Sequence, residues 1–298
     1  MEQASWRLIH LHQIKGVTRK LIWKVLKQSP DLGMLYRWNT EQWAQLFEMK
    51  LESAKRIRDG LTDIGLQREI VRQSREYAII TIFDSFYPDQ LRNIPDPPVV
   101  LYAAGNLSLL KHTPNLSVVG TRYPTENARP VMNRLLKPLL QKGWLIVSGM
   151  AIGIDGCAHE LALANGSPTI AVLGGGFEHI YPKQNAVLFH EISQKGLVIS
   201  EYPPYLTPQK YHFPERNRII SGLTFGTLVI EAKTKSGSMI TVDQALEQGR
   251  EVFAVPGSVL NKTSEGCHQL IQDGAKLVQT AMDIESEWYK ESELTSDN

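Results

Sequence analysis

The sequence predicts an α/β protein in which an extended, Rossmann-like and mostly parallel β-sheet carries helices on both faces and follows a small all-helical domain. In the second half of the chain, glycines close helix-like stretches just before short apolar runs, as expected where helices and strands alternate. The apolar runs occupy residues 116–119, 144–147, 169–173, 197–200, 227–230 and 251–255. Because strands buried on both faces read as continuous apolar runs, this alternation indicates a parallel sheet between two helical layers.

Residues 1–75 are expected to form the all-helical domain. Apolar residues recur at three- and four-residue spacing in Leu8, Leu11 and Ile14, and no strand-like alternation interrupts the pattern. Gly16-Val17 lies between two helical stretches, where a helix-hairpin-helix turn would offer backbone amides to a phosphate. An ordinary turn between helices also uses a single glycine, so both interpretations of this position remain open.

Three further segments complete the predicted organisation. Residues 76–112 are expected to be a connector, with two apolar runs around a Pro-rich stretch at 94–98. The Rossmann-like domain is expected over 113–285. Residues 286–298 are expected to be a frayed acidic tail, since the chain from Met282 to its end carries six acidic residues against one lysine.

Composition restricts the classes of partner and compartment. The formal net charge is only +1, so a nucleic-acid partner would require the positive charge to be gathered on one face. The two cysteines, Cys157 and Cys267, lack the spacing of a zinc site or a disulfide framework and are expected to be reduced thiols. We expect no metal and no cofactor. The start of the chain lacks a leader pattern and no apolar run approaches ~20 residues, so we expect a cytoplasmic protein without a membrane span.

The loops after the first two predicted strands offer phosphate-binding groups. Ligands of an open parallel sheet bind beyond the carboxyl ends of its strands. The first strand runs into Gly120-Thr121-Arg122, where a guanidinium beside helix-start amides suits a bidentate contact with phosphate; a structural arginine that caps a helix is the alternative. The second runs into a turn with Ser148, Gly149 and Gly153, where backbone N–H groups can approach an anion. Tight packing of a helix on the sheet would require the same glycines.

Cations and aromatic rings interleave after the third and fourth predicted strands. The third strand is followed by three glycines and Lys183, and the fourth by Lys210 and Phe213, with Arg216 and Arg218 close behind. Cationic groups together with ring faces suit an unpaired nucleic-acid strand. Because stacking contributes ~1–3 kcal/mol per base and every base has a ring face, we predict binding of an unpaired nucleic-acid strand with weak sequence preference.

Motifs of three enzyme classes are incomplete or absent. A dinucleotide-binding loop would place GxGxxG after the first strand, but Arg122 stands where close backbone approach is required. His159-Glu160 is not followed by the second histidine of HExxH, since position 163 is leucine, and residues 236–238 lack the flanking glycines of GxSxG. Asp155 and His159, four residues apart, are interpreted as partners in a local helix hydrogen bond. We therefore predict a binding protein and not an enzyme.

In combination, the loop motifs resemble those of the DprA/Smf family of DNA-processing proteins, over residues 80–278. The motifs are Val119-Gly120-Thr121-Arg122, Ser148-Gly149-Met150-Ala151-Ile152-Gly153-Ile154-Asp155, Ile180-Tyr181-Pro182, His212-Phe213-Pro214 with Arg216-Asn217-Arg218, and Ala245-Leu246-Glu247-Gln248-Gly249-Arg250. The resemblance implies a sterile-alpha-motif-like helical domain before the Rossmann domain. It implies that the protein binds and protects incoming single-stranded DNA during natural transformation and loads the RecA recombinase onto it. The implied strand-binding pocket is lined by Arg122, Lys183, Lys210 and Phe213.

The resemblance also implies protein partners. Family dimers pair through the end of the Rossmann domain, which makes Leu270, Ile271 and Leu277 candidate homodimer contacts, with ordinary core packing as the alternative. RecA and single-strand-binding protein are the other implied partners. Two departures from the family pattern are expected to matter: the chain stops soon after Trp288, where many relatives continue into a winged-helix domain, and residues 174–178 are a variant turn.

Two other classes of function compete with DNA binding. An enzyme of the lysine-decarboxylase-like Rossmann group would hydrolyse nucleotide glycosidic bonds, but its Gly-Gly-x-Gly-Thr loop is absent from residues 230–238. A structural adaptor would use the basic loops for contacts with protein. Binding to single- and double-stranded oligonucleotides at two salt concentrations separates these classes.

Overall fold

A computed structural model describes the backbone of residues 2–296 and the side chains of residues 2–290. The chain divides into two compact units. The helical unit comprises Met1–Tyr87 with Pro98–Ala103, and the sheet unit comprises Pro88–Pro97 with Ala104–Asn298. Residues of the predicted connector, 76–112, are therefore shared between the two units.

The helical unit packs amphipathic helices around a small apolar core. Its elements are α1 (Gln3–Gln13), α2 (Arg19–Gln28), α3 (Thr40–Leu46), α4 (Leu51–Thr62), α5 (Ile64–Glu76), β1 (Ala78–Thr81) and β2 (Val100–Gly105). Strands β1 and β2 pair antiparallel. Asn39 and Gln42 form a capping box at the start of α3, which satisfies two backbone N–H groups that the helix itself cannot. Leu8, Ile22 and Trp43 are fully or almost fully buried and contribute to the core.

The sheet unit alternates strands and helices, which confirms the predicted fold class. Its elements are α6 (Asp89–Arg92), η1 (Leu107–Lys111), β3 (Asn115–Val119), α7 (Ala128–Gln141), β4 (Leu145–Ser148), α8 (Ile154–Ala164), β5 (Thr169–Leu173), η2 (Lys183–Asn185), α9 (Ala186–Lys195), β6 (Leu197–Ser200), α10 (His212–Gly222), β7 (Gly226–Val229), α11 (Gly237–Glu247), β8 (Glu251–Ala254), α12 (Glu265–Gln272), β9 (Lys276–Leu277) and α13 (Ala281–Ser296). The six predicted strands correspond to β3 through β8, with their ends within two residues of the prediction.

The strands of the sheet unit lie in the order β6-β5-β4-β3-β7-β8-β9, and each neighbouring pair is parallel. From β3 the chain adds β4, β5 and β6 on one side and then returns to add β7 on the other side. Parallel sheets bind ligands at such a switch point, because the loops that leave the two central strands diverge there. The expected binding position is therefore the crevice beyond the carboxyl ends of β3 and β7.

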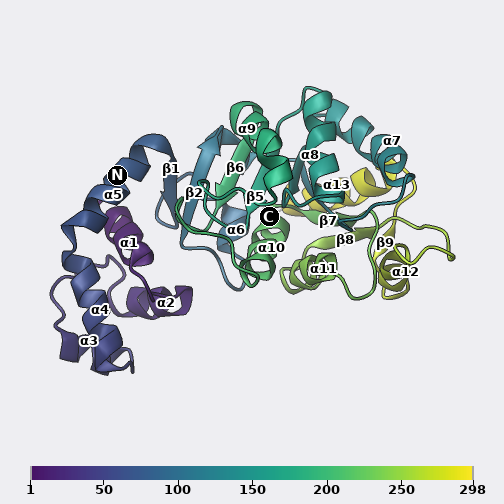
Figure 1. Cartoon of the computed structure of the whole chain (residues 1–298). Helices are drawn as coiled ribbons and strands as arrows, with labels where there is room; N and C mark the ends of the chain where they lie inside the picture. Colours follow the sequence, from purple (N-terminus) through teal and green to yellow (C-terminus); the bar gives the residue numbers. More distant parts are fainter. Residues whose placement is uncertain (1, 297–298) are drawn as a thin grey trace. The chain divides into compact units, whose positions relative to one another are not determined.

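Helices cover both faces of this sheet (Figure 1). One layer contains α7, α8 and α9, and the other contains α10, α11 and α12. An apolar cluster lies between the first layer and the central strands, and includes Leu116, Ile146, Leu136 and Phe225. Burial of this cluster fixes the strands whose carboxyl ends carry the site described below.

The carboxyl-terminal segment differs from the prediction. Residues 286–296 of the predicted frayed acidic tail belong to the helix α13, whereas residues 297–298 lie outside the described part of the chain. Ile284 is fully buried, and the ring of Trp288 packs edge-on against Trp144 and Phe225, with centroids 6.0 and 5.2 Å away. The acidic composition concealed this apolar stripe. Strand β9 was not predicted, because its two residues are both exposed and make no apolar run. Over residues 2–296, no helix has the length and apolarity needed to cross a bilayer.

Candidate nucleic-acid interface

A cavity of about 700 Å³ opens beyond the carboxyl ends of β3 and β7; we call it the strand-end cavity. Its lining comes from the loops after β3, β5, β6 and β7, the starts of α8 and α11, one face of α10, and Thr263 before α12. The lining side chains that bear on binding are Arg122, Tyr123, Asp155, Tyr181, Lys210, Phe213, Arg216, Asn217, Lys233 and Ser238. A smaller recess of about 40 Å³ shares Arg122 and Arg216 with it and adds Gly149. The cavity thus occupies the position that the switch of strand order predicts.

Helix α10 presents four lining residues on one face. Phe213, Arg216, Asn217 and Ile220 follow the spacing i, i+3, i+4, i+7, which places side chains on one stripe of a helix. Ile219 lies outside this stripe and is fully buried. The sequence of α10 therefore divides between a face that packs and a face that lines the cavity.

The turn that carries Arg122 is held on both sides by backbone hydrogen bonds. The N–H of Thr121 donates to the carbonyl oxygen of Glu231 at 2.7 Å, and the N–H of Ile154 donates to the carbonyl oxygen of Thr121 at 3.2 Å. The buried Glu231 carboxylate accepts from the backbone N–H of Thr125 at 3.0 Å and from its hydroxyl at 2.5 Å. Arg122 is exposed on this fixed turn, and within the described side chains no carboxylate lies within ion-pair distance of it.

Gly153 supports the same turn from below. Its φ is +84°, and a Cβ there would overlap the carbonyl oxygen of Thr121 and the backbone of Arg122. We expect Gly153→Ala to lower the free energy of unfolding in urea by about 2–4 kcal/mol, from backbone strain and overpacking. Gly166→Ala is the matched control, because φ is +71° but nothing lies within 4 Å of the added carbon. An equal loss of unfolding free energy in both variants would show that the positive φ alone causes the loss. The overlap of the added Cβ with the Thr121–Arg122 turn would then contribute nothing.

Arg216 forms the floor of the cavity. Its Nη1 donates to the carbonyl oxygens of Gly149 and Val172, each at 2.5 Å, and the side chain is almost fully buried. Burial lowers the pKa of Arg216 to about 10, a value at which the group stays charged at neutral pH. A Cβ on Gly149 would overlap the guanidinium, so the glycine is required by this close approach. Burial likewise raises the pKa of the neighbouring Asp155 carboxyl, which accepts the Gly149 N–H at 3.2 Å.

Exposed cations and aromatic rings face the cavity together. Lys210 and Lys233 are exposed, and no carboxylate among the described side chains forms an ion pair with either. The rings of Tyr181 and Phe213 lie next to each other with centroids 5.4 Å apart, and Tyr181 is 53% exposed. Tyr123 adds a ring that is 79% exposed. The arrangement offers positive charge and ring faces in one concave surface, which suits a flexible polyanion with flat bases.

Several residues predicted from the sequence lie outside the lining. Ser148 is fully buried, and its hydroxyl donates to the carbonyl oxygen of Val118 at 2.6 Å, so it stabilises the sheet. Lys183 is exposed in η2 but does not line the strand-end cavity, although its neighbours Tyr181 and Pro182 line the adjoining recess. Gly120 and Thr121 do line the cavity.

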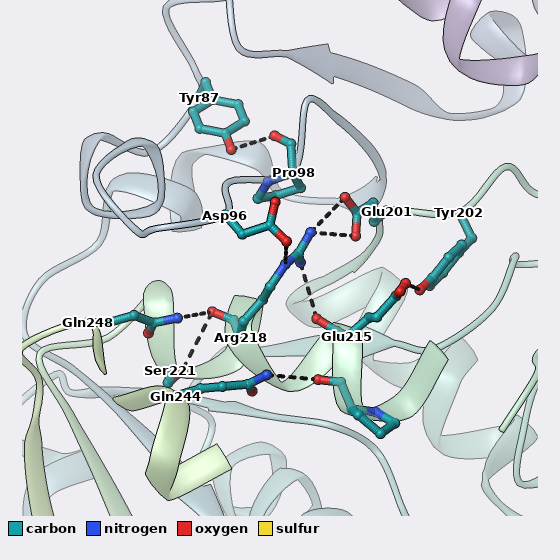
Figure 2. A network of polar contacts seen from close by, with 11 residues as sticks. Tyr87, Asp96, Pro98, Glu201, Tyr202, Glu215, Arg218, Ser221, Gln244 and Gln248 are labelled. Atoms are coloured by element: carbon teal, nitrogen blue, oxygen red, sulfur yellow. Dashed lines mark hydrogen bonds and ion pairs between the residues drawn. The ribbon is translucent and has the colours of Figure 1, made fainter. Parts of the chain in front are cut away.

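The prediction that Arg218 binds DNA is not supported by its surroundings. Arg218 is buried, and its Nη2 lies 2.8 Å from both carboxylate oxygens of the buried Glu201 (Figure 2). Its Nε lies 3.6 Å from Asp96, and its Nη1 donates to the carbonyl oxygen of Glu215 at 3.2 Å. The Tyr202 hydroxyl donates to the Glu215 carboxylate at 2.8 Å. The guanidinium is therefore engaged in an internal ion pair, because Arg218 lies off the stripe of α10 that lines the cavity.

The three residues predicted at a dimer contact differ in exposure. Leu270 is 6% exposed and belongs to the core of its own chain, whereas Ile271 is partly buried and Leu277 is 39% exposed. Leu277 belongs to β9, the last strand in the order of this sheet. Leu270 is therefore unavailable to a second chain without rearrangement.

Sequence reasoning missed Lys233 and Asn217 as lining residues. Lys233 follows β7 by four positions, so the rule that singled out the loops after β3 to β6 applies equally to it. Asn217 belongs to a family motif, but no role was predicted for it. Its spacing of four residues from Phe213 places both side chains on one face of α10 and could have identified it.

The prediction of a local hydrogen bond between Asp155 and His159 is wrong. The Nδ1 of His159 pairs instead with the Thr169 hydroxyl at 2.8 Å, and Asp155 accepts from the Gly149 N–H. Burial and the nearby Arg216 charge lower the pKa of His159 to about 3, so this imidazole is neutral near pH 7. His159 and Asp155 therefore do not act as a catalytic pair. Within residues 2–290, no group of three or more His, Cys, Asp or Glu side chains is arranged to hold a metal.

The parallel sheet, the switch point and the cationic cavity define a Rossmann-like α/β protein with its candidate site at the strand ends. Residues 78–289 match the family model of DNA recombination-mediator protein A. The chain belongs to this family, and its resemblance to DprA/Smf proteins is confirmed.

Similar proteins cover most of the chain. DNA processing protein DprA of Bacillus subtilis is 50% identical over 268 residues, which are 86% of this chain and 89% of that protein. The structure of DprA from Streptococcus pneumoniae has a TM-score of 0.85 and 39% identity, and the match covers 96% of this chain and 99% of that one. DNA processing protein A of Helicobacter pylori, whose structure was described for its single-stranded DNA binding mode, has a TM-score of 0.65 and 30% identity and covers 72% of this chain and 97% of that one.

Proposed function

We propose that this chain binds single-stranded DNA in the strand-end cavity, protects incoming strands during natural transformation and loads RecA onto them. One observation carries the proposal: the cations Arg122, Lys210 and Lys233 face the same cavity as the rings of Tyr181 and Phe213. The cations attract phosphates, and the rings stack on bases that only an unpaired strand exposes. The single-stranded DNA binding mode described for the Helicobacter pylori relative supports the same ligand.

The proposed action is binding without catalysis, and it requires neither metal nor cofactor. Asp155, the carboxylate in the described lining, is buried beside the Arg216 guanidinium. The described lining therefore offers no exposed carboxylate that could act as a general base for a nucleophile. The proposal includes action in the cytoplasm, where incoming strands and RecA meet.

We further propose that the chain acts as a homodimer, with RecA and single-strand-binding protein as its other partners. The exposed Leu277 on the outermost strand β9, together with the partly buried Ile271, supports a contact at this end of the sheet unit. An edge strand presents backbone N–H and C=O groups with which a strand of another chain can pair. Leu270 is left out of this contact, because it is packed inside its own chain.

Tyr181→Ala tests the stacking role. Removing one stacking ring is expected to lower the affinity for a short oligothymidylate about tenfold, since each stacked base contributes ~1–3 kcal/mol. Fluorescence anisotropy of a labelled oligonucleotide measures the affinity. Tyr211→Ala is the matched control, because Tyr211 is 63% exposed two residues before Phe213 but does not line the cavity. Equal affinities for the two variants would refute stacking at Tyr181.

A second measurement tests the loading step. RecA filament formation on DNA coated with single-strand-binding protein is followed through the ATPase activity of RecA. The wild-type chain is expected to shorten the lag, and Tyr181→Ala is expected to need about tenfold more protein for the same effect. A wild-type chain that binds the oligonucleotide but leaves the lag unchanged would reject RecA loading and keep strand binding.

A further inference from the structure

The amino-terminal end of the helical unit concentrates positive charge. Residues 3–30 contain no aspartate or glutamate and carry Arg7, Lys15, Arg19, Lys20, Lys24 and Lys27. The whole chain has 32 basic and 31 acidic residues, so this local excess is offset elsewhere. A single-sign cluster on a chain of balanced charge creates a local field that attracts anions.

Four of the cations in this unit line one groove, which we call the helical-unit groove. Its volume is about 350 Å³, and it lies between the turn that joins α1 to α2 and the start of α4. Lys15 comes from the turn, Lys20 and Lys24 from α2, and Arg56 from α4. All four side chains are exposed, and none of the described lining residues is acidic.

The sequence of α2 places these charges where they oppose helix stability. Ile22, Val25 and Leu26 are buried, so Lys20 and Lys24 lie on the exposed side, four residues apart. Like charges at this spacing repel, and cations in the first turn are unfavourable beside the positive end of the helix dipole. No acidic residue stands in the first turn of α2. An anion bound in the groove would relieve both effects.

The lining of the helical-unit groove lacks the stacking surface of the strand-end cavity. Phe47, the aromatic residue in its described lining, is 5% exposed and packs edge-on against Trp38. A groove that offers cations but no exposed aromatic ring can contact phosphates without stacking on bases. A duplex presents its phosphates outside and keeps its bases stacked inside, so it satisfies such a surface better than an unpaired strand does.

We propose that the helical unit binds the phosphate backbone of duplex DNA in this groove. The interpretation of the Gly16-Val17 turn as a phosphate contact agrees with this placement, since Gly16 and Thr18 also line the groove. The inference does not rest on the proposed function, because all its residues belong to the helical unit, whereas Arg122 and its neighbours belong to the sheet unit.

The double variant Lys20→Gln/Lys24→Gln in the full chain tests the proposal. We expect its affinity for a labelled duplex of about 20 base pairs to fall at least about tenfold at moderate salt, and the slope of log K against log salt to decrease by about 2. Affinity for a short oligothymidylate is expected to stay within about twofold. The control Lys50→Gln/Lys55→Gln removes two exposed charges of the same unit that do not line the groove, and its duplex affinity is expected to match the wild type.

Three outcomes would overturn the proposal: a wild-type chain that does not bind the duplex, a groove variant that binds it unchanged, or a control variant that loses as much affinity as the groove variant. Thermal unfolding of each variant checks that it is folded, which is expected because the replaced side chains are exposed. Vesicles with anionic lipid provide a third arm, in which binding of vesicles without binding of duplex assigns the groove to membranes instead. If the wild-type chain does not bind oligothymidylate, the proposed strand-end site is rejected. The duplex measurements would then still decide whether the helical-unit groove binds DNA.

Discussion

Replacing Arg122 with glutamate is expected to lower the affinity for a short oligothymidylate about a hundredfold. Arg122 is exposed on a turn that is held in place by hydrogen bonds of the Thr121 backbone N–H and carbonyl, so its guanidinium is available for two charge-assisted hydrogen bonds to one phosphate. Each such bond contributes about 1.5–3 kcal/mol, and each 1.4 kcal/mol corresponds to tenfold in affinity. The glutamate adds repulsion, and the salt dependence of binding should flatten because fewer counterions are released.

Two charge reversals control for the change in net charge. Arg134→Glu alters an exposed residue of α7 that does not line the cavity, and Lys183→Glu alters the predicted site residue that lies outside the lining. Both are expected to reduce affinity less than about threefold, through the general field alone. If Lys183→Glu weakens binding as much as Arg122→Glu, the bound strand extends beyond the strand-end cavity. Unchanged binding by Arg122→Glu itself would remove the cavity as the site.

The second large effect is expected on stability and not on binding. Arg218→Met should lower the free energy of unfolding by about 3–5 kcal/mol, because it removes the Arg218 guanidinium from its ion pair with the buried Glu201 carboxylate. Both side chains of this pair are 6% exposed, so water cannot replace the lost contact. Denaturation in urea measures the change, and oligothymidylate affinity of the folded variant is expected to remain within about twofold, since Arg218 does not line the cavity.

A double variant separates loss of the pair from loss of packing. Glu201→Gln/Arg218→Met removes both charges and is expected to be more stable than Arg218→Met, because a buried carboxylate that has lost its guanidinium costs more than two neutral groups. If Arg218→Met does not fold, Glu201→Gln alone provides a milder disruption of the same pair. A fully stable Arg218→Met with impaired DNA binding would reverse the assignment and restore Arg218 to the binding surface.

The pattern of apolar residues was sufficient to predict the strands of the sheet. It failed to predict elements whose local composition is polar although some of their side chains are buried. The runs at 169–173 and 197–200 became β5 and β6 with the same ends, since strands buried on both faces leave an uninterrupted apolar signature. Helix α13 was misread as an acidic tail because its carboxylates dominate the local composition, although Ala281, Ile284 and Trp288 follow the i, i+3, i+7 spacing of one helix face. Two-residue β9 has no signature of its own and exists through pairing with β8.

Sequence by itself determined the fold class, the loops that follow each strand and the family, because these depend on local periodicity and on motifs that are contiguous in the chain. Tertiary structure alone decided which basic residues share a surface. Arg216 and Arg218 are two positions apart on α10, yet one forms the floor of the strand-end cavity and the other pairs with Glu201. A turn of 100° per residue directs neighbouring side chains to different surroundings, and only the packing of α10 against the rest of the unit determines what each one meets.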